Sequence, residues 1–256
     1  MQKRIGIIGY GFIGQYLFAK AVKEEFIEID FVYDLNSQRT AELDPYLVLT
    51  DIRQLHERHV DLVVEAAHPE AVREFAPDII KQADLLTFSL TAFADDSFRK
   101  HMVERAEAAN RFVYIPHGAV LGLDGLQDGR EVIDAVSITT VKHPRNLGLE
   151  NEAAGEPVTI YEGSTRGACY KFPRNVNVHA AVALAGIGFD RTISKIVSDQ
   201  QTDRMAHTIQ VKGKGLQWEL CMESYATGTV TGSYTPESVY QTVKRLCRHD
   251  VGFKIT

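Results

Sequence analysis

The stretch RIGIIGYGFIGQYLFAK at residues 4–20 decides how this 256-residue chain begins. It opens with a short apolar run typical of a buried strand and continues with the spacing of a helix. Between the two lie Gly9, Gly11 and Gly14, in the pattern GxGxxG. Gly9 permits a tight turn, Gly11 leaves the backbone open to a phosphate, and Gly14 lets the helix pack closely on the sheet. The stretch therefore predicts a phosphate-binding strand, turn and helix.

The next predicted strand ends in an acid at the spacing that dinucleotide-binding folds use. Asp34 lies 20 residues after Gly14 and closes the run EIDFVYD at 28–34. Its carboxylate would accept hydrogen bonds from the adenosine ribose and repel a 2′-phosphate, which favours NAD, while Arg39 nearby leaves NADP possible. Glycines at these spacings also occur in ordinary tight turns, so a purely structural turn is the competing interpretation.

Apolar runs and helical segments alternate through the first half of the chain. The runs lie at 4–9, 28–34, 61–67, 84–90 and 111–116, and helical spacing is found at 12–26, 70–82 and 97–110. Runs that are apolar on both faces suit buried parallel strands, and their alternation with helices indicates a doubly wound sheet. We predict a Rossmann-type α/β domain over residues 1–120. A last helix is expected near 236–249 and could return to either domain.

The second half predicts a different architecture. Strand-like runs with more alternation lie at 135–144, 156–163, 191–199, 206–215 and 216–226, and one helical stretch interrupts them at 176–188. Several strands with hairpin-like links and one helix favour an open, mostly antiparallel sheet covered on one face. We therefore expect a second domain of α+β type over residues 121–231.

Composition narrows the classes of partner. The formal net charge is −6, and lysines and arginines are scattered, so nucleic acid is not an expected partner. No apolar run approaches the length of a membrane helix, and no signal-peptide pattern begins the chain. Three widely separated cysteines indicate neither a disulfide framework nor a thiolate zinc site. These features predict a soluble cytoplasmic protein without a metal or a membrane partner.

Histidines are the first candidates for proton transfer, because their pKa is most easily tuned near neutrality. His68 and His117 follow predicted strands at the sheet edge where ligands of this fold bind. His179 lies in an apolar helix, where a satisfied core residue and a functional one are equally good interpretations. His207 stands just before the alternating run TIQVKG and is the candidate proton carrier.

The polar cluster KFPRNVNV at 171–178 is the candidate substrate-binding segment. It enters the second domain's clearest predicted helix, where Arg174, Asn175 and Asn177 would present hydrogen-bond donors to an anion. The simpler alternative is that Asn175 only caps the helix. Lys142 and Arg166, near other strand ends, would add positive charge.

Taken together, the motifs resemble a known family. In chain order they are GxGxxG, VVEAAHPEAV (63–72), SLTAFAD (89–95), GAVLGLDGL (118–126), TTVKHP (139–144), EGSTRGA (162–168), FPRNVNVHAAVALAG (172–186) and a histidine before TIQVKGKG. Nearly the whole chain thus resembles the L-aspartate dehydrogenase family. Three positions depart from residues usual in that family: Thr91, Gly167 and Met205.

The resemblance implies NAD(P)-dependent oxidative deamination of L-aspartate to iminoaspartate, which hydrolyses to oxaloacetate and ammonia or feeds NAD biosynthesis. It also implies that the C-terminal helix, at about 232–256, completes the Rossmann domain, and that residues 121–231 form a catalytic and dimerisation domain of α+β type. It further implies a homodimer and His207 as the catalytic acid/base. The predicted cofactor-binding residues are Gly9, Gly11, Phe12, Ile13, Gly14, Asp34, Ala66, His68, Ser89, Ala119 and Asn177. The predicted substrate-binding residues are Arg174, Asn175 and Asn177.

Two alternatives stay open at this point. The first is an NAD(P)-dependent dehydrogenase or imine reductase that acts on a different amino acid or amine, since the departures fall near the expected substrate. The second is a non-catalytic NAD-binding redox sensor, which would bind the coenzyme without needing His207.

Overall fold

The structure, a computed structural model, describes residues 2–149, 155–225 and 232–248. It divides into two compact units. The first is Met1–Phe88, Met102–Pro116 and Pro236–Thr256, and the second is Ser89–His101 and His117–Thr235. The domain limits expected from the sequence placed residues 89–101, 117–120 and 232–235 in the first domain, whereas these residues belong to the second unit. Residues 226–231 and 249–256 lie outside the described part of the chain.

A five-stranded parallel sheet forms the centre of the first unit, in the order β2-β1-β3-β4-β5. Its strands are β1 (Lys3–Ile8), β2 (Ile27–Tyr33), β3 (Leu62–Glu65), β4 (Asp84–Thr87) and β5 (Val113–Tyr114). Val48 forms a single parallel bridge with Val32, at the edge of β2. If Val48 is counted as a reduced third strand, the order is the usual one of a Rossmann sheet, 3-2-1-4-5-6. The predicted fold class is therefore confirmed for this half.

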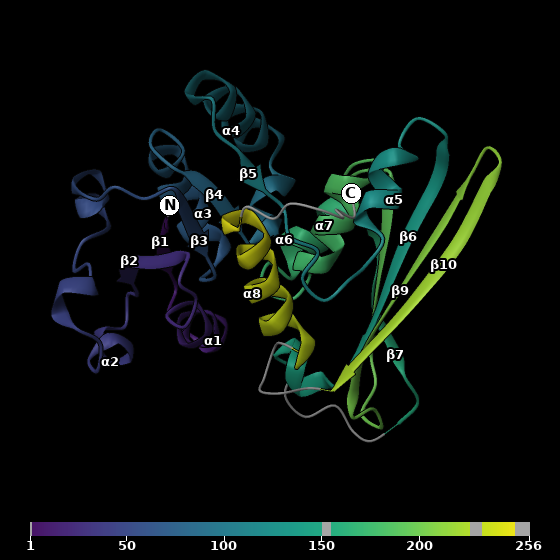
Figure 1. The fold of residues 1–256 in the computed structure, drawn as a ribbon. Helices are drawn as coiled ribbons and strands as arrows, with labels where there is room; N and C mark the ends of the chain where they lie inside the picture. Colours follow the sequence, from purple (N-terminus) through teal and green to yellow (C-terminus); the bar gives the residue numbers. More distant parts are fainter. Residues whose placement is uncertain (1, 150–154, 226–231, 249–256) are drawn as a thin grey trace. The chain divides into compact units, whose positions relative to one another are not determined.

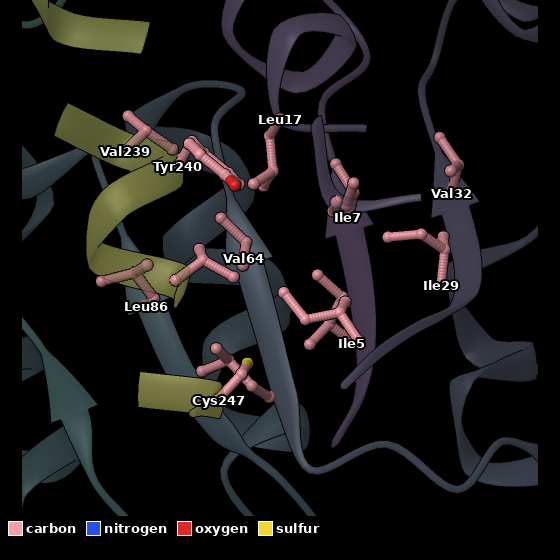
Figure 2. Packing of buried hydrophobic residues seen from close by; sticks show 14 of the residues in the cluster. Ile5, Ile7, Leu17, Ile29, Val32, Val64, Leu86, Val239, Tyr240 and Cys247 are labelled. Carbon is pink, nitrogen blue, oxygen red and sulfur yellow. The ribbon is translucent and has the colours of Figure 1, made fainter. Parts of the chain in front are cut away.

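Helices and short turns surround that sheet. Those that lie wholly or partly in the first unit are α1 (Phe12–Ala21), α2 (Ser37–Thr40), η1 (Pro45–Leu47), η2 (Ile52–Glu57), α3 (Pro69–Ile79), α4 (Asp96–Ala109) and α8 (Tyr234–Cys247). Side chains of α8 join those of α1 and the strands in one apolar core, as Figure 2 shows for Val239, Tyr240, Leu17 and Val64. The helix that ends the described chain thus completes the sheet with which the chain begins.

Polar contacts hold α8 in the same place. Tyr16 of α1 donates its hydroxyl hydrogen to Oε2 of Glu237 at 2.5 Å, and Lys244 Nζ donates to Oε1 of Glu24 at 2.6 Å. Tyr240 also hydrogen bonds Glu24. These pairs join residues more than 200 positions apart in the sequence, so the first unit is built from both ends of the chain.

The second unit contains a five-stranded mixed sheet in the order β10-β9-β6-β8-β7. Its strands are β6 (Ile133–Lys142), β7 (Val158–Ser164), β8 (Thr192–Ser198), β9 (Arg204–Gly213) and β10 (Leu216–Tyr225). Only the β6–β8 pair is parallel, which confirms the mostly antiparallel sheet predicted from the alternating runs.

More helices occur in the second unit than the single one predicted. They are η3 (Leu90–Ala94), α5 (Leu123–Asp128), η4 (Pro144–Leu147), α6 (Thr165–Lys171) and α7 (Asn177–Ala185), with the first part of α4. Helices α5, α6 and α7 lie along one face of the sheet (Figure 1). The missed helices are short, and α5 and α6 have too few turns to give an amphipathic repeat. In the described residues no helix is long and apolar enough to cross a membrane.

Candidate active site

The glycine loop of the first unit is shaped by close backbone packing. Gly9 has φ +92°, and a Cβ there would lie 2.7 Å from the backbone of Ala66 after β3. A Cβ on Gly14 would lie 2.0 Å from the carbonyl oxygen of Gly9. Both positions require glycine, because the strand ends of β1 and β3 and the start of α1 leave no room for a side chain. The loop lies where the strand order reverses, which is the ligand site of open α/β sheets.

The first turn of α1 leaves its backbone donors available. Gln15 N donates to Gly11 O as the first bond of the helix, so the N–H groups of Phe12, Ile13 and Gly14 have no partner of that kind. A Cβ added to Gly11 would meet only Nη1 of Arg39, at 3.7 Å. Open space at Gly11 and outward backbone donors suit a pyrophosphate, and the residues present therefore fit a dinucleotide.

Asp34 is fixed at the end of β2 by the same loop. Its Oδ2 accepts a hydrogen bond from Tyr10 N at 2.7 Å, and its Oδ1 accepts one from Asn36 N at 2.8 Å. Arg39 Nη1 lies 3.3 Å from Oδ2, in a pair whose aspartate side chain is only 7% exposed and whose arginine is half exposed. A carboxylate held in this way is oriented for a ribose, and Arg39 beside it supplies the cation that a 2′-phosphate would need.

Two other predicted cofactor residues follow β3. Ala66 supplies the backbone that packs on Gly9. His68 instead caps α3, because its Nδ1 accepts a hydrogen bond from Ala71 N at 3.2 Å, and Glu70 Oε2 lies 3.1 Å from the same nitrogen. His68 is thus engaged in local structure, and a cofactor contact from its ring stays a prediction.

In the second unit, His207 is the central residue. The structure places it inside β9, opposite Thr140 of β6, and not before the strand as the alternating run suggested. The strand begins at Arg204 because Arg204 and Met205 pair with Tyr225 and Ser224 of β10, while pairing with β6 starts at Ala206. The ring is buried, and its Nδ1 lies 2.8 Å from Thr140 Oγ1. Burial and the nearby Lys142 charge lower the pKa of His207 to about 3, so the free imidazole is neutral.

The sheet face that carries His207 changes character along its length. At one end its buried side chains are the apolar Val136, Ile138 and Val211, which pack with Val182 of α7. At the other end they are Thr140, Lys142, Ser198 and His207. Burying polar side chains costs folding free energy unless they find partners. Their grouping at one end of the sheet therefore indicates a functional site.

Lys142 carries the positive charge of this polar end. Its side chain is buried, and Nζ donates to Asn175 O at 3.3 Å. No carboxylate of the described residues forms an ion pair with it, and burial lowers its pKa to about 8. A buried ammonium of this kind is expensive unless an anion joins it, so the position suits a ligand carboxylate.

The segment at 172–177 is tied to the rest of the second unit by Thr91. Its hydroxyl donates to Pro173 O at 2.7 Å, and its backbone N donates to Asn177 Oδ1 at 3.3 Å. Asn175 does not cap α7, whose N-cap is Val176, because the chain turns one residue later than the capping alternative requires. Asn175 Oδ1 is buried without a hydrogen-bond partner in the described structure, and its carbonyl receives Lys142.

The remaining predicted residues have distinct surroundings. Arg174 is exposed and makes no hydrogen bond or ion pair with the described residues, so its guanidinium is available. Ser89 is buried where η3 begins, and Ala119 is partly buried in the turn closed by Val120 N to His117 O. The described contacts bring His207, Lys142 and Asn175 to one end of the second sheet.

Arg166 was expected to add positive charge to the site because it lies near a strand end, but its contacts give it a structural role. It pairs with Asp190 at 2.6 Å and Asp96 at 3.0 Å and also hydrogen bonds Ala94 O. These partners belong to three different segments, so Arg166 joins them, and its charge is already compensated.

Sequence reasoning missed Thr140 and treated Thr91 only as a departure from the family. A threonine in an alternating strand gives no sign of its function, since threonine is common there for its shape. Gly167, another departure, has a packing reason: a Cβ there would lie 2.3 Å from the hydroxyl of Tyr161.

Comparison with known proteins places this geometry in a family. Residues 124–246 match the family model described as aspartate dehydrogenase, C-terminal, and residues 9–116 match that of the homoserine dehydrogenase NAD binding domain. L-Aspartate dehydrogenase of Methanococcoides burtonii is 35% identical over 228 residues, which cover 82% of this chain and 84% of the relative. The chain belongs to the L-aspartate dehydrogenase family.

Other members extend the likeness to both units. L-Aspartate dehydrogenase of Nitrosopumilus maritimus is 29% identical over 97% of this chain and 98% of its own length. The crystal structure of aspartate dehydrogenase from Thermotoga maritima matches with a TM-score of 0.80 and 28% identity, over 99% of this chain and 100% of that one. The family resemblance inferred from the motifs is therefore confirmed, together with both sheets.

Proposed function

We propose that the protein is an NAD(P)-dependent L-aspartate dehydrogenase. It would convert L-aspartate to iminoaspartate, which hydrolyses to oxaloacetate and ammonia, and would run the reverse reductive amination. The observation that carries the proposal is the polar end of the second sheet, where a neutral buried histidine lies near an unpaired buried ammonium. That pair suits an anionic substrate that must also exchange a proton.

We assign dinucleotide binding to residues 1–120 with about 232–256, and catalysis and dimerisation to residues 121–231. Bound nicotinamide dinucleotide supplies the hydride acceptor at C4. The donors at the start of α1 and the carboxylate of Asp34 would hold its pyrophosphate and ribose, with NAD as the preferred form. Arg39 beside Asp34 supports NADP as a second form.

His207 would move the proton in this scheme. As general base it would take a proton from the substrate amine as the Cα–H bond breaks and hydride leaves. It would then return that proton to the imine nitrogen, and so be free to take a proton from the water that attacks the imine carbon. Burial is the larger cause of the low pKa of His207, and the charge of Lys142 is the second. A dicarboxylate near Lys142 would offset that second cause and so make the imidazole a better base when substrate is present. The burial of His207 also limits competition from bulk water.

We infer that Lys142 receives one substrate carboxylate and that the 172–177 segment contacts the rest of the molecule. Lys142 and Asn175 already meet through the Asn175 carbonyl, and the free Oδ1 of Asn175 is an acceptor suited to the substrate amine. Arg174 is exposed and would bind a second carboxylate. Asn177, held by Thr91, would lie near the nicotinamide with Ala119 and Ser89.

We further propose a cytoplasmic homodimer that binds small molecules and no nucleic acid or membrane. The dimer is supported by the resemblance to the L-aspartate dehydrogenase family. Light scattering of the purified protein tests this part separately from the enzymatic activity.

A substrate panel tests the function. Reduced nicotinamide absorbance is followed with NAD or NADP and a series of amino acids, and then with oxaloacetate plus ammonia. We expect L-aspartate to give the highest kcat/KM. Turnover of another amine alone would assign a different substrate, and coenzyme binding without any turnover would identify a redox sensor instead.

A further inference from the structure

A chain of hydrogen bonds runs through the buried interior of the second unit and ends on His207. Thr165 Oγ1 lies 3.0 Å from Thr192 O and 2.7 Å from Ser194 Oγ. Ser194 Oγ lies 2.9 Å from His179 Nδ1. Thr140 Oγ1 then lies 2.7 Å from His179 Nε2 and 2.8 Å from His207 Nδ1. All five side chains are buried, so water does not supply alternative partners to most of these atoms.

The far end of the chain has a fixed direction. A carbonyl oxygen only accepts, so the single hydroxyl hydrogen of Thr165 goes to Thr192 O. Thr165 must then accept from Ser194, whose only hydrogen is used in that bond. Ser194 can therefore only accept at its contact with His179, and Nδ1 of His179 carries the hydrogen.

The direction passes through His179 because that ring is neutral. Burial, with the nearby charge of Lys142, lowers the pKa of His179 well below its ordinary value. A neutral imidazole with hydrogen on Nδ1 has a lone pair on Nε2, which accepts from the Thr140 hydroxyl. Thr140 has then used its hydrogen and can only accept from Nδ1 of His207.

We propose that this chain sets the tautomer of His207, with hydrogen on Nδ1 and the lone pair on Nε2, so that Nε2 is the atom that exchanges protons with substrate. Thr140 and His179 are positioning residues that act through His207, and Thr165 fixes the direction from the Thr192 carbonyl. Nε2 has no hydrogen-bond partner in the described residues, which leaves it available. The inference rests on the proposed function only for the identity of the substrate.

The direct test is ¹⁵N NMR of the whole protein labelled at histidine, without substrate. Protonated and unprotonated ring nitrogens have well separated shifts, and loss of signals in His207→Gln assigns the ring. We expect protonated Nδ1 and unprotonated Nε2 for both His207 and His179 at neutral pH. Hydrogen on Nε2 of His207 would overturn the proposal even if the enzyme turns over aspartate.

Variants test whether the chain causes that state. Thr140→Val removes the acceptor, and we expect kcat/KM to fall by about 100-fold, within the usual range for a disturbed general base, with a mixed tautomer in the spectrum. Thr140→Ser keeps the hydroxyl and should restore both. Thr139→Val is the matched control. Thr139 is next to Thr140 in the sequence, but its side chain lies on the other face of β6 and takes no part in the hydrogen-bond chain. Equal tautomer populations in wild type and Thr140→Val would contradict the proposal.

The NMR result and the substrate panel have separate meanings. A protein with the expected tautomer but no amino-acid turnover would refute the proposed function and leave the hydrogen-bond chain supported. Turnover of aspartate with His207 protonated on Nε2 would leave the function supported and refute the chain. Thr165→Val extends the test to its remote end, where an unchanged His207 tautomer would remove Thr165 from the mechanism.

Discussion

Replacing Lys142 with methionine should stabilise the protein while it impairs substrate binding. Burial lowers the pKa of Lys142 from 10.5 to about 8. At about 1.36 kcal/mol for each pKa unit, keeping the ammonium charged in the folded state costs about 3 kcal/mol. Methionine fills a similar volume without charge, but leaves Asn175 O without its donor, which costs about 1 kcal/mol. The expected net gain is about 2 kcal/mol at pH 7.

The chain offers a convenient probe for this measurement. Trp218 is the only tryptophan, and it packs on the apolar core of the second unit. Urea unfolding followed by its fluorescence therefore reports the unit that contains Lys142. Lys142→Met should also raise KM for L-aspartate strongly, because the carboxylate loses its cation, while the affinity for NAD stays near that of the wild type.

The pH dependence separates charge from packing. The folded pKa of Lys142 lies below its unfolded value, so between about pH 8 and 10.5 the unfolded state binds more protons and wild-type stability rises with pH. The advantage of the variant should be complete below about pH 8 and shrink toward pH 10.5. A variant less stable than wild type at pH 7, or a gap independent of pH, would refute the reasoning. Lys195→Met, at a partly exposed surface pair, is the control.

Three further predictions concern the glycine loop, the coenzyme and His207. Gly14→Ala places a Cβ 2.0 Å from Gly9 O, so NADH affinity measured by fluorescence titration should fall at least 10-fold; unchanged affinity would remove the loop from coenzyme binding. Asp34→Ser should move the kcat/KM ratio toward NADP, since Arg39 loses its partner, and a stronger NAD preference would contradict this role. Because His207 has a pKa of about 3 when folded and 6.5 otherwise, stability should fall as pH drops below about 6.5, by up to about 5 kcal/mol near pH 3, and the slope should be smaller in His207→Gln. Equal slopes in urea unfolding would show that His207 is not the group responsible.

The first unit was the more predictable half, because its signals are local. The closely spaced glycines follow a strand directly and are themselves followed by an acidic residue, Asp34, at a fixed spacing. Each of these signals supports the interpretation of the others. All five parallel strands and the main helices followed from apolar runs. The edge position of Val48 was not predicted, since one bridge leaves no pattern in a sequence.

The candidate site of the second unit was harder, because its residues meet through pairing across the sheet. His207 could be selected as a histidine, but its partner Thr140 lies 67 positions away and depends on the β6–β9 register. Thr91 likewise acts through residues 82 and 86 positions later. The register between β6 and β9 cannot be read from a single sequence, so the prediction reached individual residues and missed the contacts that give them their properties.

The return of α8 to the first sheet has a consequence for synthesis of the protein. All strands of the second unit lie within residues 133–225 and precede α8 in the chain. A ribosome therefore delivers a complete second sheet before Val239, Tyr240 and Val243 can cover the first. The N-terminal half must wait with part of its apolar surface exposed, and the longest loop closure comes last. Deleting α8 should consequently harm the half of the molecule that was synthesised first.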